Sequence, residues 1–274
     1  MKLLRHYLKV YGLILSTGPA CGTWAVLWAY TKLIGQAHWV AKFGGGTKET
    51  NTLVLFGKRV YFPSYVFLLH QFEEIFVLDA YRSEILGKKT LIIDGGSHLG
   101  MSVLYFITAY PESKVLSFEP DAKAFQLLQQ FVRHNHLSQV TLVNAALAGT
   151  TGKLTFFTHA DASGKLDAGA YTTSTATVPV TVPAQTLSTY LTEPVALLKL
   201  DIEGAEVEVI QELIASQKIA MVQEIVLEFH TEIHPSPENL VTLLANAGFT
   251  AKRKDALALY ETDASDFLLH FTRK

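Results

Sequence analysis

The sequence predicts an α/β fold of the Rossmann-like type, a mostly parallel sheet with helices on both faces. Three observations predict it. From Lys89 onward, short apolar runs alternate with amphipathic segments. The first apolar run leads directly into a glycine-rich turn, and the second ends in an acidic residue. Strands that alternate with helices imply parallel βαβ units, because parallel neighbours must be joined by a crossover.

An N-terminal extension precedes this alternating region. Its expected elements are helices at about 2–15 and 23–34, strands at 52–56 and 59–62, and a helix at 66–78. The two strands, separated by Gly57-Lys58, predict a hairpin. We therefore divide the chain into an N-terminal helical and β-hairpin cap, residues 1–82, and a second domain, residues 83–274.

The stretch Val10–Thr31 contains no charged residue and follows three basic residues. Such a pattern is typical of a membrane-spanning segment or a signal peptide. However, Gly18-Pro19 lies in its middle and would break a spanning helix, and the first half is amphipathic. We expect a soluble helical cap. Membrane contact by the N-terminal helices stays an alternative that the sequence does not favour.

Composition narrows the range of partners. The chain has 23 Lys and Arg against 25 Asp and Glu, so it lacks the basic excess of nucleic-acid-binding proteins, and no nucleic acid partner is expected. Cys21 is the single cysteine, which rules out a disulfide within the chain and a Cys-based zinc site. A cytoplasmic location is the default expectation.

The second domain is expected to contain strands at 90–94, 114–119, 140–143, 152–157, 177–182, 195–200 and 224–229, and a terminal antiparallel pair at 257–261 and 267–272. The expected helices are 99–110, 121–136, 205–215 and 237–247. The segment Ala160–Thr175 is rich in Gly, Ala, Ser and Thr, and we interpret it as a mobile functional loop.

The strongest site signal is IIDGGSHLG at 92–100, where a buried strand enters a glycine turn and then a helix. Glycines allow close backbone approach to a ligand, and helix N-terminal N–H groups suit a small anionic group. Glu119 ends the next strand, 25 positions after Asp94, where an acidic residue can bind a ribose diol. Without a ligand, the same features describe a tight turn and a solvated carboxylate.

The cofactor type follows from the turn. A dinucleotide fingerprint needs glycine at the first, third and sixth positions, but Ser97 occupies the third position counted from Gly95. Asp94 just before the turn would repel a pyrophosphate but suits an ammonium group. S-adenosylmethionine, which carries an α-amino group, a carboxylate and a sulfonium, therefore fits the turn better than NAD or FAD.

Two further strand ends carry charged residues. Lys199-Leu200-Asp201 ends one strand, where Asp201 is placed for the reaction centre and Lys199 can pair with a carboxylate. Glu228 and His230 end another strand, on one face of it. With Asp201 they predict a general base, although a metal-ligand set or a structural hydrogen-bond network would use the same residues. Glu206 is expected to cap the helix that follows.

These motifs together resemble the FkbM family of S-adenosylmethionine-dependent methyltransferases. The resemblance covers about 90–249 and rests on IIDGGSHLGMSVLYF, VLSFEPDAKAFQLLQQFVRHN, VTLVNAALAGTTGKLTFF, LLKLDIEGAEVEVI and VLEFH, of which KLDIEGAE is the most specific. It implies a class I methyltransferase fold, a seven-stranded mostly parallel sheet with the last strand antiparallel. It also implies O-methylation of a hydroxyl on a sugar or natural-product-like acceptor.

By motif, the resemblance implies that the methionine end of the cofactor is held by Asp94, Gly95, Gly96, Ser97 and Gly100. It implies ribose binding by Glu119 and adenosine contacts from Pro120, Asp121, Asn144 and Ala145. Asp201 would face methyl transfer, with Asp201 or His230 as base. Family members often have Ala-Asn at Ser97-His98. Tyr81, in a stretch resembling the relatives' approach to the core, would close over the cofactor. An NAD-dependent oxidoreductase and a catalytically silent nucleoside-binding or scaffold protein stay as alternatives.

Overall fold

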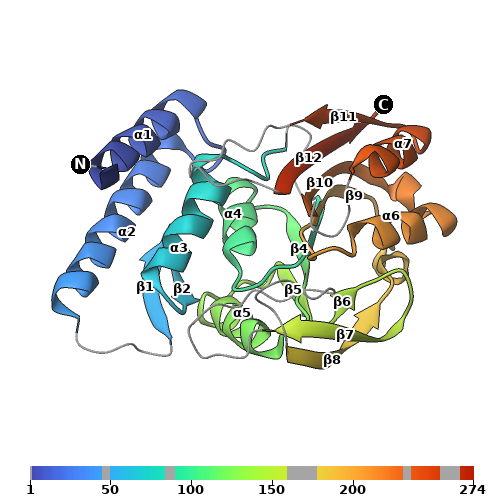
Figure 1. Cartoon of the computed structure of the whole chain (residues 1–274), viewed down its shortest axis with the longest axis horizontal. Helices are drawn as coiled ribbons and strands as arrows, with labels where there is room; N and C mark the ends of the chain where they lie inside the picture. The colour runs from blue at the N-terminus through green and yellow to red at the C-terminus, as the bar shows by residue number, and fades with distance from the viewer. Residues whose placement is uncertain (1, 45–49, 84–89, 159–177, 231–235, 254–265) are drawn as a thin grey trace.

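The structure is a computed structural model that describes residues 2–44, 50–83, 90–158, 178–230, 236–253 and 266–274 (Figure 1). A seven-stranded sheet forms its centre. Across the sheet, the strands are β11 (Phe249–Arg253), β12 (Asp266–Arg273), β10 (Val222–His230), β9 (Val195–Leu200), β3 (Leu91–Gly95), β4 (Lys114–Phe118) and β5 (Val140–Val143). Only β12 runs antiparallel to its neighbours β10 and β11. The predicted class I methyltransferase fold, seven-stranded and mostly parallel, is confirmed.

The three central strands end at the same level of the sheet. Gly95 at the end of β3 pairs with Phe118 of β4 on one side and with Leu200 of β9 on the other. Because parallel strands in register bring their carboxyl ends together, the residues that follow each strand meet at one edge. The glycine turn, Glu119 and Asp201 therefore come together.

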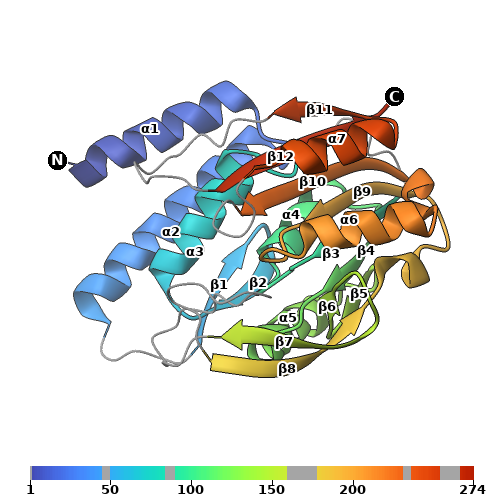
Figure 2. The ribbon, with the colours of Figure 1, turned by 45° about the vertical axis from the view of Figure 1, so that its right-hand side comes forward.

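Helices cover both faces of the sheet, as predicted. The helices of the second domain are α4 (Met101–Ala109), α5 (Ala122–His134), α6 (Glu206–Ala215) and α7 (Glu238–Asn246). Successive strand residues point to opposite faces, so Ile92 packs in the core with α4 and α5, and Ile93 packs in the core with α6 and α7. Figure 2 shows α6 and α7 together on one side of the sheet.

A small second sheet lies beside the main one, and the sequence did not predict it as a separate unit. It consists of β6 (Ala146–Leu147), β8 (Val178–Gln185) and β7 (Gly152–Thr158). Two short 3₁₀ turns, η2 (Leu187–Tyr190) and η3 (Lys218–Met221), lie outside this sheet. The strands at 152–157 and 177–182 were predicted, but they pair with each other. The predicted loop 160–175 lies outside the described residues.

The predicted partner of the last strand is wrong. The expected pair joined 257–261 to 267–272, whereas β12 pairs with β11 at Phe249–Arg253. Segment 257–261 itself lies outside the described residues. β11 begins directly after Gly248, whose φ of 89° ends α7 and turns the chain back.

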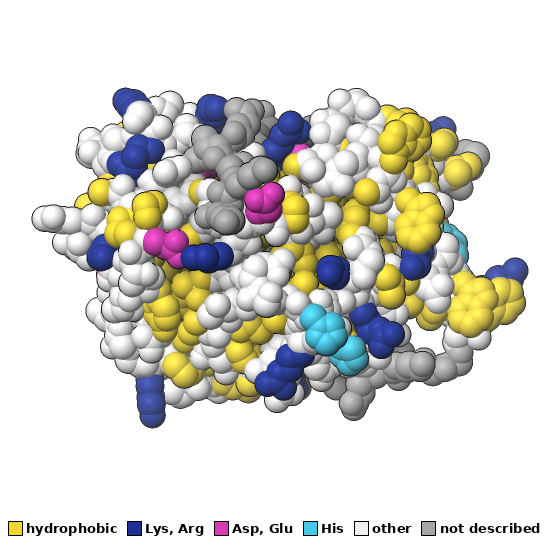
Figure 3. Space-filling model, turned by 180° about the vertical axis from the view of Figure 1, so that it is seen from behind, with side chains coloured by type: hydrophobic (Ala, Val, Ile, Leu, Met, Phe, Trp, Pro, Cys, Tyr) yellow, Lys and Arg dark blue, Asp and Glu magenta, His cyan; other side chains and the backbone are white. Residues whose placement is uncertain are grey.

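The N-terminal extension contains α1 (Lys2–Thr17), α2 (Thr23–Phe43), β1 (Asn51–Leu55), β2 (Lys58–Phe62), α3 (Tyr65–Phe72) and a π-helical turn, η1 (Glu73–Val77). α2 extends nine residues beyond the predicted end at Ile34, because Gly35 continues the helix instead of ending it. No helix among the described residues has the length and hydropathy to cross a bilayer. Hydrophobic and basic side chains gather over α1 and α2 on the face shown in Figure 3.

One hydrophobic core joins the extension to the sheet, so a boundary at 82/83 stays a prediction. The core contains side chains from α1, α2 and the hairpin together with α4 and α5. Two buried carboxylates add polar links. Glu73 accepts hydrogen bonds from Tyr30 Oη (2.6 Å) and His6 Nε2 (3.0 Å). Asp79 accepts one from Tyr105 Oη of α4 at 2.6 Å. These contacts fix the extension on the face that α4 covers.

Tyr30→Phe is expected to destabilise the fold. It removes a hydroxyl that donates to the buried Glu73 carboxylate, and a lost hydrogen bond to a buried charged group costs about 1–3 kcal/mol of unfolding free energy. Urea denaturation followed by circular dichroism measures this loss. Tyr11→Phe is the matched control, since it removes an exposed hydrogen bond to Thr31 and should cost less than about 0.5 kcal/mol. Equal losses would contradict the linking role of Glu73.

Candidate active site

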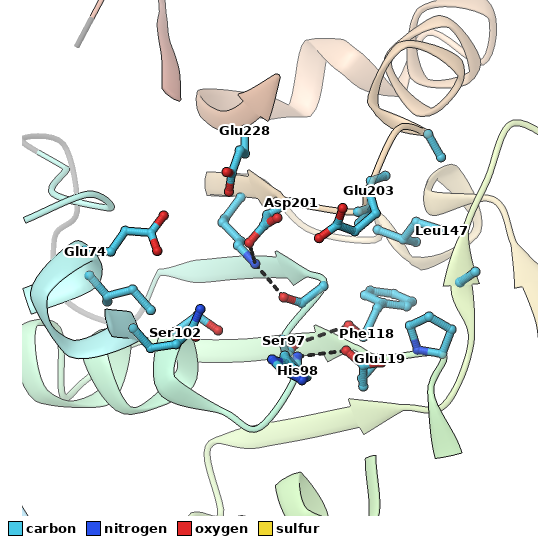
Figure 4. Close-up of a pocket in the computed structure, with 18 of the residues that line it drawn as sticks. Glu74, Ser97, His98, Ser102, Phe118, Glu119, Leu147, Asp201, Glu203 and Glu228 are labelled. Carbon is cyan, nitrogen blue, oxygen red and sulfur yellow. Dashed lines mark hydrogen bonds and ion pairs between the residues drawn. The ribbon is translucent and has the colours of Figure 1, made fainter. Parts of the chain in front are cut away.

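A cavity of about 740 Å³ opens at the carboxyl ends of β3, β4 and β9. One part is lined by the glycine turn and the ends of β4 and β5, and the opposite part by the end of β9, β10 and the extension. Figure 4 shows Ser97, His98 and Glu119 at one end and Glu74, Asp201 and Glu228 directed toward the other. Of the residues expected at the site, the lining includes Tyr81, Gly96, Ser97, Glu119, Pro120, Ala145, Asp201 and Glu228.

Gly96 shapes the floor of the cavity. Its φ of 79° lies in the left-handed region, and a Cβ at this position would lie 1.7 Å from the carbonyl oxygen of Asp201. The turn after β3 therefore touches the backbone after β9, which only glycine permits. The sequence motif predicted that the backbone approaches a ligand closely at this glycine. The close contact in the structure is with the backbone of Asp201.

The backbone N–H groups of the turn are engaged within the protein. Gly96 and Ser97 both donate to the carbonyl oxygen of Phe118 at 3.0 Å, and Gly100 donates to that of Ser97 at 2.8 Å. The N–H of His98 donates to Glu119 Oε2 at 2.8 Å. Binding of an anionic ligand by these N–H groups stays a prediction; in the structure those of Gly96, Ser97 and His98 connect the turn to the end of β4, and that of Gly100 closes the turn itself.

Lys199 is a buried ammonium at the centre of the floor. Its Nζ donates to the carbonyl oxygens of Gly95 (3.0 Å) and Gly96 (2.6 Å). It also lies 3.2 Å from Asp94 Oδ1 and 3.4 Å from Asp201 Oδ2. Burial lowers the pKa of Lys199, but Asp201 and Asp94 raise it more strongly, to about 12. The lysine is therefore charged at neutral pH and fixes the ends of β3 and β9 to each other.

Asp94 does not line the cavity, so its contact with the cofactor's ammonium group, directly or through water, stays a prediction. Its side chain is fully buried beneath the turn. One carboxylate oxygen faces Lys199, and the other accepts a hydrogen bond from Ser102 Oγ at 2.7 Å. The ammonium that Asp94 neutralises is thus the chain's own lysine. The sequence indicated a cationic partner but could not show that residue 199 supplies it.

Glu119 is almost fully buried at the opposite end of the cavity. Oε1 accepts a hydrogen bond from the N–H of Asp121 at 2.7 Å, and Oε2 accepts one from His98. Burial raises the pKa of Glu119 to about 8, although the two N–H donors lower it. These donors fix the orientation of the carboxylate, and each oxygen keeps a second lone pair with which it can accept from a ligand hydroxyl.

Several other expected cofactor residues support the site from outside the lining. Asp121 caps α5, accepting from the N–H groups of Lys123 and Ala124. Asn144 donates to the carbonyl oxygen of Glu119 at 2.8 Å. Gly95 presents its carbonyl to Lys199, and Gly100 has a φ of 91° at the start of α4. Ligand contact by these four residues stays a prediction; in the structure they hold the backbone that carries the lining.

The expected catalytic residues are partly brought together. Asp201 and Glu228 line the cavity from neighbouring strands. The side chain of His230 lies outside the described part of the structure, so its role stays a prediction. The expected capping of α6 by Glu206 is not found, since no side chain that the structure describes caps this helix; Glu206 instead accepts hydrogen bonds from the N–H groups of Ile202 (3.1 Å) and Gly204 (3.2 Å) in the loop before it. No group of three metal-ligating side chains is found among the described residues.

The extension supplies cavity residues that strand-end reasoning missed. They come from the segment between the hairpin and η1, and comprise Ser64, Val66, Phe67, His70, Gln71, Glu74 and Ile75. None follows a β-strand of the main sheet, so the rule for parallel strands could not find them. The signal that did exist was the likeness of the stretch around Tyr81 to the one preceding the core in FkbM relatives. Tyr81 lies with its ring 5.6 Å from Lys199 Nζ.

Glu74 is the most informative of these residues. It projects from the π-helical turn into the part of the cavity that contains Asp201 and Glu228 (Figure 4). Its side chain lines the cavity and is 38% exposed. Burial raises the pKa of Glu74 to about 7, with a further increase from Asp201 and a decrease from Lys199. Glu74 is therefore a carboxyl group that can gain or lose a proton near neutral pH.

The profile of the family described as "Methyltransferase FkbM domain" matches residues 94–251, more than half of the chain. "Methyltransferase 1" of Beauveria bassiana (strain ARSEF 2860) is 29% identical over 162 residues, 52% of this chain and 65% of that protein. "Methyltransferase sdnD" of Sordaria araneosa is 27% identical over 217 residues, 68% of this chain and 83% of that protein. The chain thus spans slightly less than two thirds of the Beauveria relative.

Among solved structures, methyltransferase FkbM from Methylobacillus flagellatus KT aligns with a TM-score of 0.49 and 14% identity. The alignment covers 67% of this chain and 43% of that chain.

Lys199→Met is expected to destabilise the protein strongly. The substitution keeps the length of the side chain but leaves the buried Asp94 without its counter-charge, and breaking a buried ion pair costs about 3–5 kcal/mol. Denaturant unfolding of both proteins measures the difference. Lys114→Met is the control, because Lys114 and Glu193 form an exposed ion pair whose loss should cost less than about 1 kcal/mol. A Lys199 variant as stable as wild type would show that the floor does not depend on this ammonium.

Proposed function

The chain belongs to the FkbM methyltransferase family, and we propose that it transfers a methyl group from S-adenosyl-L-methionine to a hydroxyl oxygen of a sugar or natural-product-like acceptor. One observation carries this proposal: Gly96, Glu119 and Asp201, from the ends of three neighbouring strands, line a single cavity. Its volume of about 740 Å³ falls within the range of small-molecule sites.

The lining fits a nucleoside at one end. Glu119 has two oriented carboxylate oxygens for a ribose diol. Beside it, apolar surface suited to an adenine ring is provided by Phe118, Pro120, Ala145 and Leu147. Gly96 and Ser97 line the part of the cavity where we expect the methionine end. When bound, this cofactor supplies a methyl group on a positively charged sulfur, already activated for transfer.

The opposite end is acidic. Glu74, Asp201 and Glu228 come from three different elements and face one space, beside the ammonium of Lys199. Carboxylates at this end favour a sulfonium cation and can accept hydrogen bonds from the hydroxyl groups of an acceptor. We propose that this end binds the acceptor, and that residues 1–82 act as a cap that shapes it.

Within this end, Glu74 is our candidate for the general base. Asp201 lies 3.4 Å from the Lys199 ammonium and is engaged in the ion pairs that fix the floor. The pKa of about 7 at Glu74 matches the requirement for a base that works near neutral pH. The acceptor hydroxyl would give its proton to the Glu74 carboxylate while its oxygen receives the methyl group. His230 stays a second candidate from sequence.

Two alternatives are separable by experiment. An NAD-dependent oxidoreductase would need backbone N–H groups for a pyrophosphate, whereas those of Gly96 and Ser97 already donate to Phe118. A catalytically silent nucleoside-binding protein would keep cofactor affinity but show no methyl transfer. Calorimetric titration with S-adenosylhomocysteine and with NAD, followed by a methyl-transfer assay against hydroxylated acceptors, separates these alternatives.

Glu119→Ala should weaken S-adenosylhomocysteine binding by about ten- to a hundredfold, because the hydrogen bonds between the ribose diol and the buried Glu119 carboxyl group are lost. Isothermal titration calorimetry measures the affinity. The control is Glu112→Ala, an exposed glutamate just before the other end of the same strand, which should bind as wild type does. Unchanged affinity of the Glu119 variant would remove the ribose assignment.

Glu74→Gln should lower kcat by about 10²–10⁴-fold without a matching loss of cofactor affinity. As an ionised base, Glu74 makes the wild-type rate rise with pH up to about 7 and then level off, since the carboxylate form accepts the proton. The Gln variant should lack this rise, and Glu74→Asp should keep part of it. If Asp201→Asn or His230→Ala removes the pH dependence and Glu74→Gln does not, the base is not Glu74.

A further inference from the structure

The two N-terminal helices expose large apolar side chains that the methyltransferase proposal does not use. All three tryptophans of the chain lie on α2, and each is more than half exposed: Trp24 (79%), Trp28 (65%) and Trp39 (57%). Phe43 at the end of α2 is also exposed, and α1 adds Leu4, Leu8 and Leu15. We refer to these seven residues as the helical apolar face. Exposed apolar residues gathered in this way mark an interaction surface.

Helical geometry places the members from α2 on one side of that helix. Trp28 and Trp39 follow Trp24 by 4 and 15 residues, which returns to nearly the same angle around an α-helix. The buried side of α2 is opposite and carries Val26, Ala29, Tyr30 and Leu33. Leu4, Leu8 and Leu15 are aligned along α1 in the same way. Each helix therefore has an inner side packed on the protein and a separate exposed apolar row.

A contact between the helices brings these two rows to the same side of the molecule. Tyr11 Oη of α1 and Thr31 Oγ1 of α2 are hydrogen-bonded at 2.8 Å, and the rings of Tyr7 and His38 are 5.7 Å apart. The two helices thus run antiparallel. Tyr11 lies in the same row as Leu8 and Leu15, and Thr31 borders the row of Trp24 and Trp28. The leucines and tryptophans consequently form one surface across the helix pair.

The two helices themselves carry only basic charge. α1 and α2 contain five Lys or Arg residues and no Asp or Glu; since the whole chain has a net charge of −2, the rest carries −7. Figure 3 shows Lys and Arg side chains among the hydrophobic ones over α1 and α2. Lys32 Nζ lies 5.2 Å from the ring of Trp28, and Lys42 Nζ lies 5.1 Å from that of Phe43.

We propose that α1 and α2 bind the surface of an anionic lipid bilayer and lie in the interface with the helical apolar face directed toward the acyl chains. Tryptophan at the headgroup level, leucine below it and Lys or Arg beside it form the combination that amphipathic interfacial helices use. Five positive charges on α1 and α2, without a carboxylate on either helix, complement anionic headgroups. A second copy of the chain fits worse, because it would bring two such basic surfaces together.

Intrinsic fluorescence tests the proposal on the unmodified protein. Since all three tryptophans lie on the helical apolar face, their emission reports insertion directly. Mixed phosphatidylcholine–phosphatidylglycerol vesicles should shift the emission to the blue and sediment with the protein. Vesicles of phosphatidylcholine alone should bind at least about tenfold more weakly, and salt should weaken binding to the mixed vesicles.

Two sets of variants locate the surface. Trp24→Ser with Trp28→Ser and Trp39→Ser should lower vesicle binding at least about tenfold, as should the set Arg5→Gln, Lys9→Gln and Lys42→Gln. The matched charge control is the set Lys58→Gln, Lys123→Gln and Lys153→Gln elsewhere on the chain, which should bind as wild type does. Val178→Ser is the apolar control, an exposed valine of β8. Circular dichroism checks that each variant folds.

Three results would overturn the proposal. The first is unchanged tryptophan emission with no sedimentation on anionic vesicles. The second is binding that both variant sets keep at wild-type strength, which would assign it to another surface. The third is self-association without lipid that the tryptophan variants remove, which would assign the helical apolar face to a second copy of the chain.

Discussion

The buried ammonium of Lys199 is the interaction on which the site depends. It ties two backbone carbonyls after β3 to the carboxylates of Asp94 and Asp201, so the ends of two strands are fixed to each other. A buried charge is costly unless partners surround it, and here four oxygen atoms from both strands do so. Lys199 thus compensates the charge of the buried Asp94, while Asp201 also faces the cavity together with Glu74 and Glu228.

Elsewhere in the cavity, polar groups are likewise held by hydrogen bonds within the protein. Backbone N–H groups of the glycine turn hold β4, and Glu119 is oriented by N–H donors on both of its oxygens. Such groups are positioned before any ligand arrives, which lowers the ordering cost of binding. The turn therefore contributes shape and rigidity, and the side chains at the two ends of the cavity contribute recognition.

The extension completes this arrangement in two ways. Its π-helical turn places Glu73 inward, where Tyr30 and His6 satisfy the carboxylate, and Glu74 into the cavity. An extra residue in the turn changes which side chains face in each direction, as π-helical segments at functional sites commonly do. The opposite side of the extension carries the helical apolar face. The extension thus contributes to the site and the hydrophobic core, and it also presents an exposed apolar surface.

The sequence by itself determined the α/β fold class, the glycine turn and the acidic strand ends. Short periodic patterns indicate which residues end a strand, and parallel strands end at one edge of the sheet. It also identified Glu119, Asp201 and Glu228 as residues of that edge. Only the tertiary structure decided that Asp94 faces Lys199, that the turn's N–H groups are engaged, and that Glu74 enters the cavity. Those facts depend on contacts between segments far apart in the chain, such as Gly95 with Lys199, which no local pattern encodes.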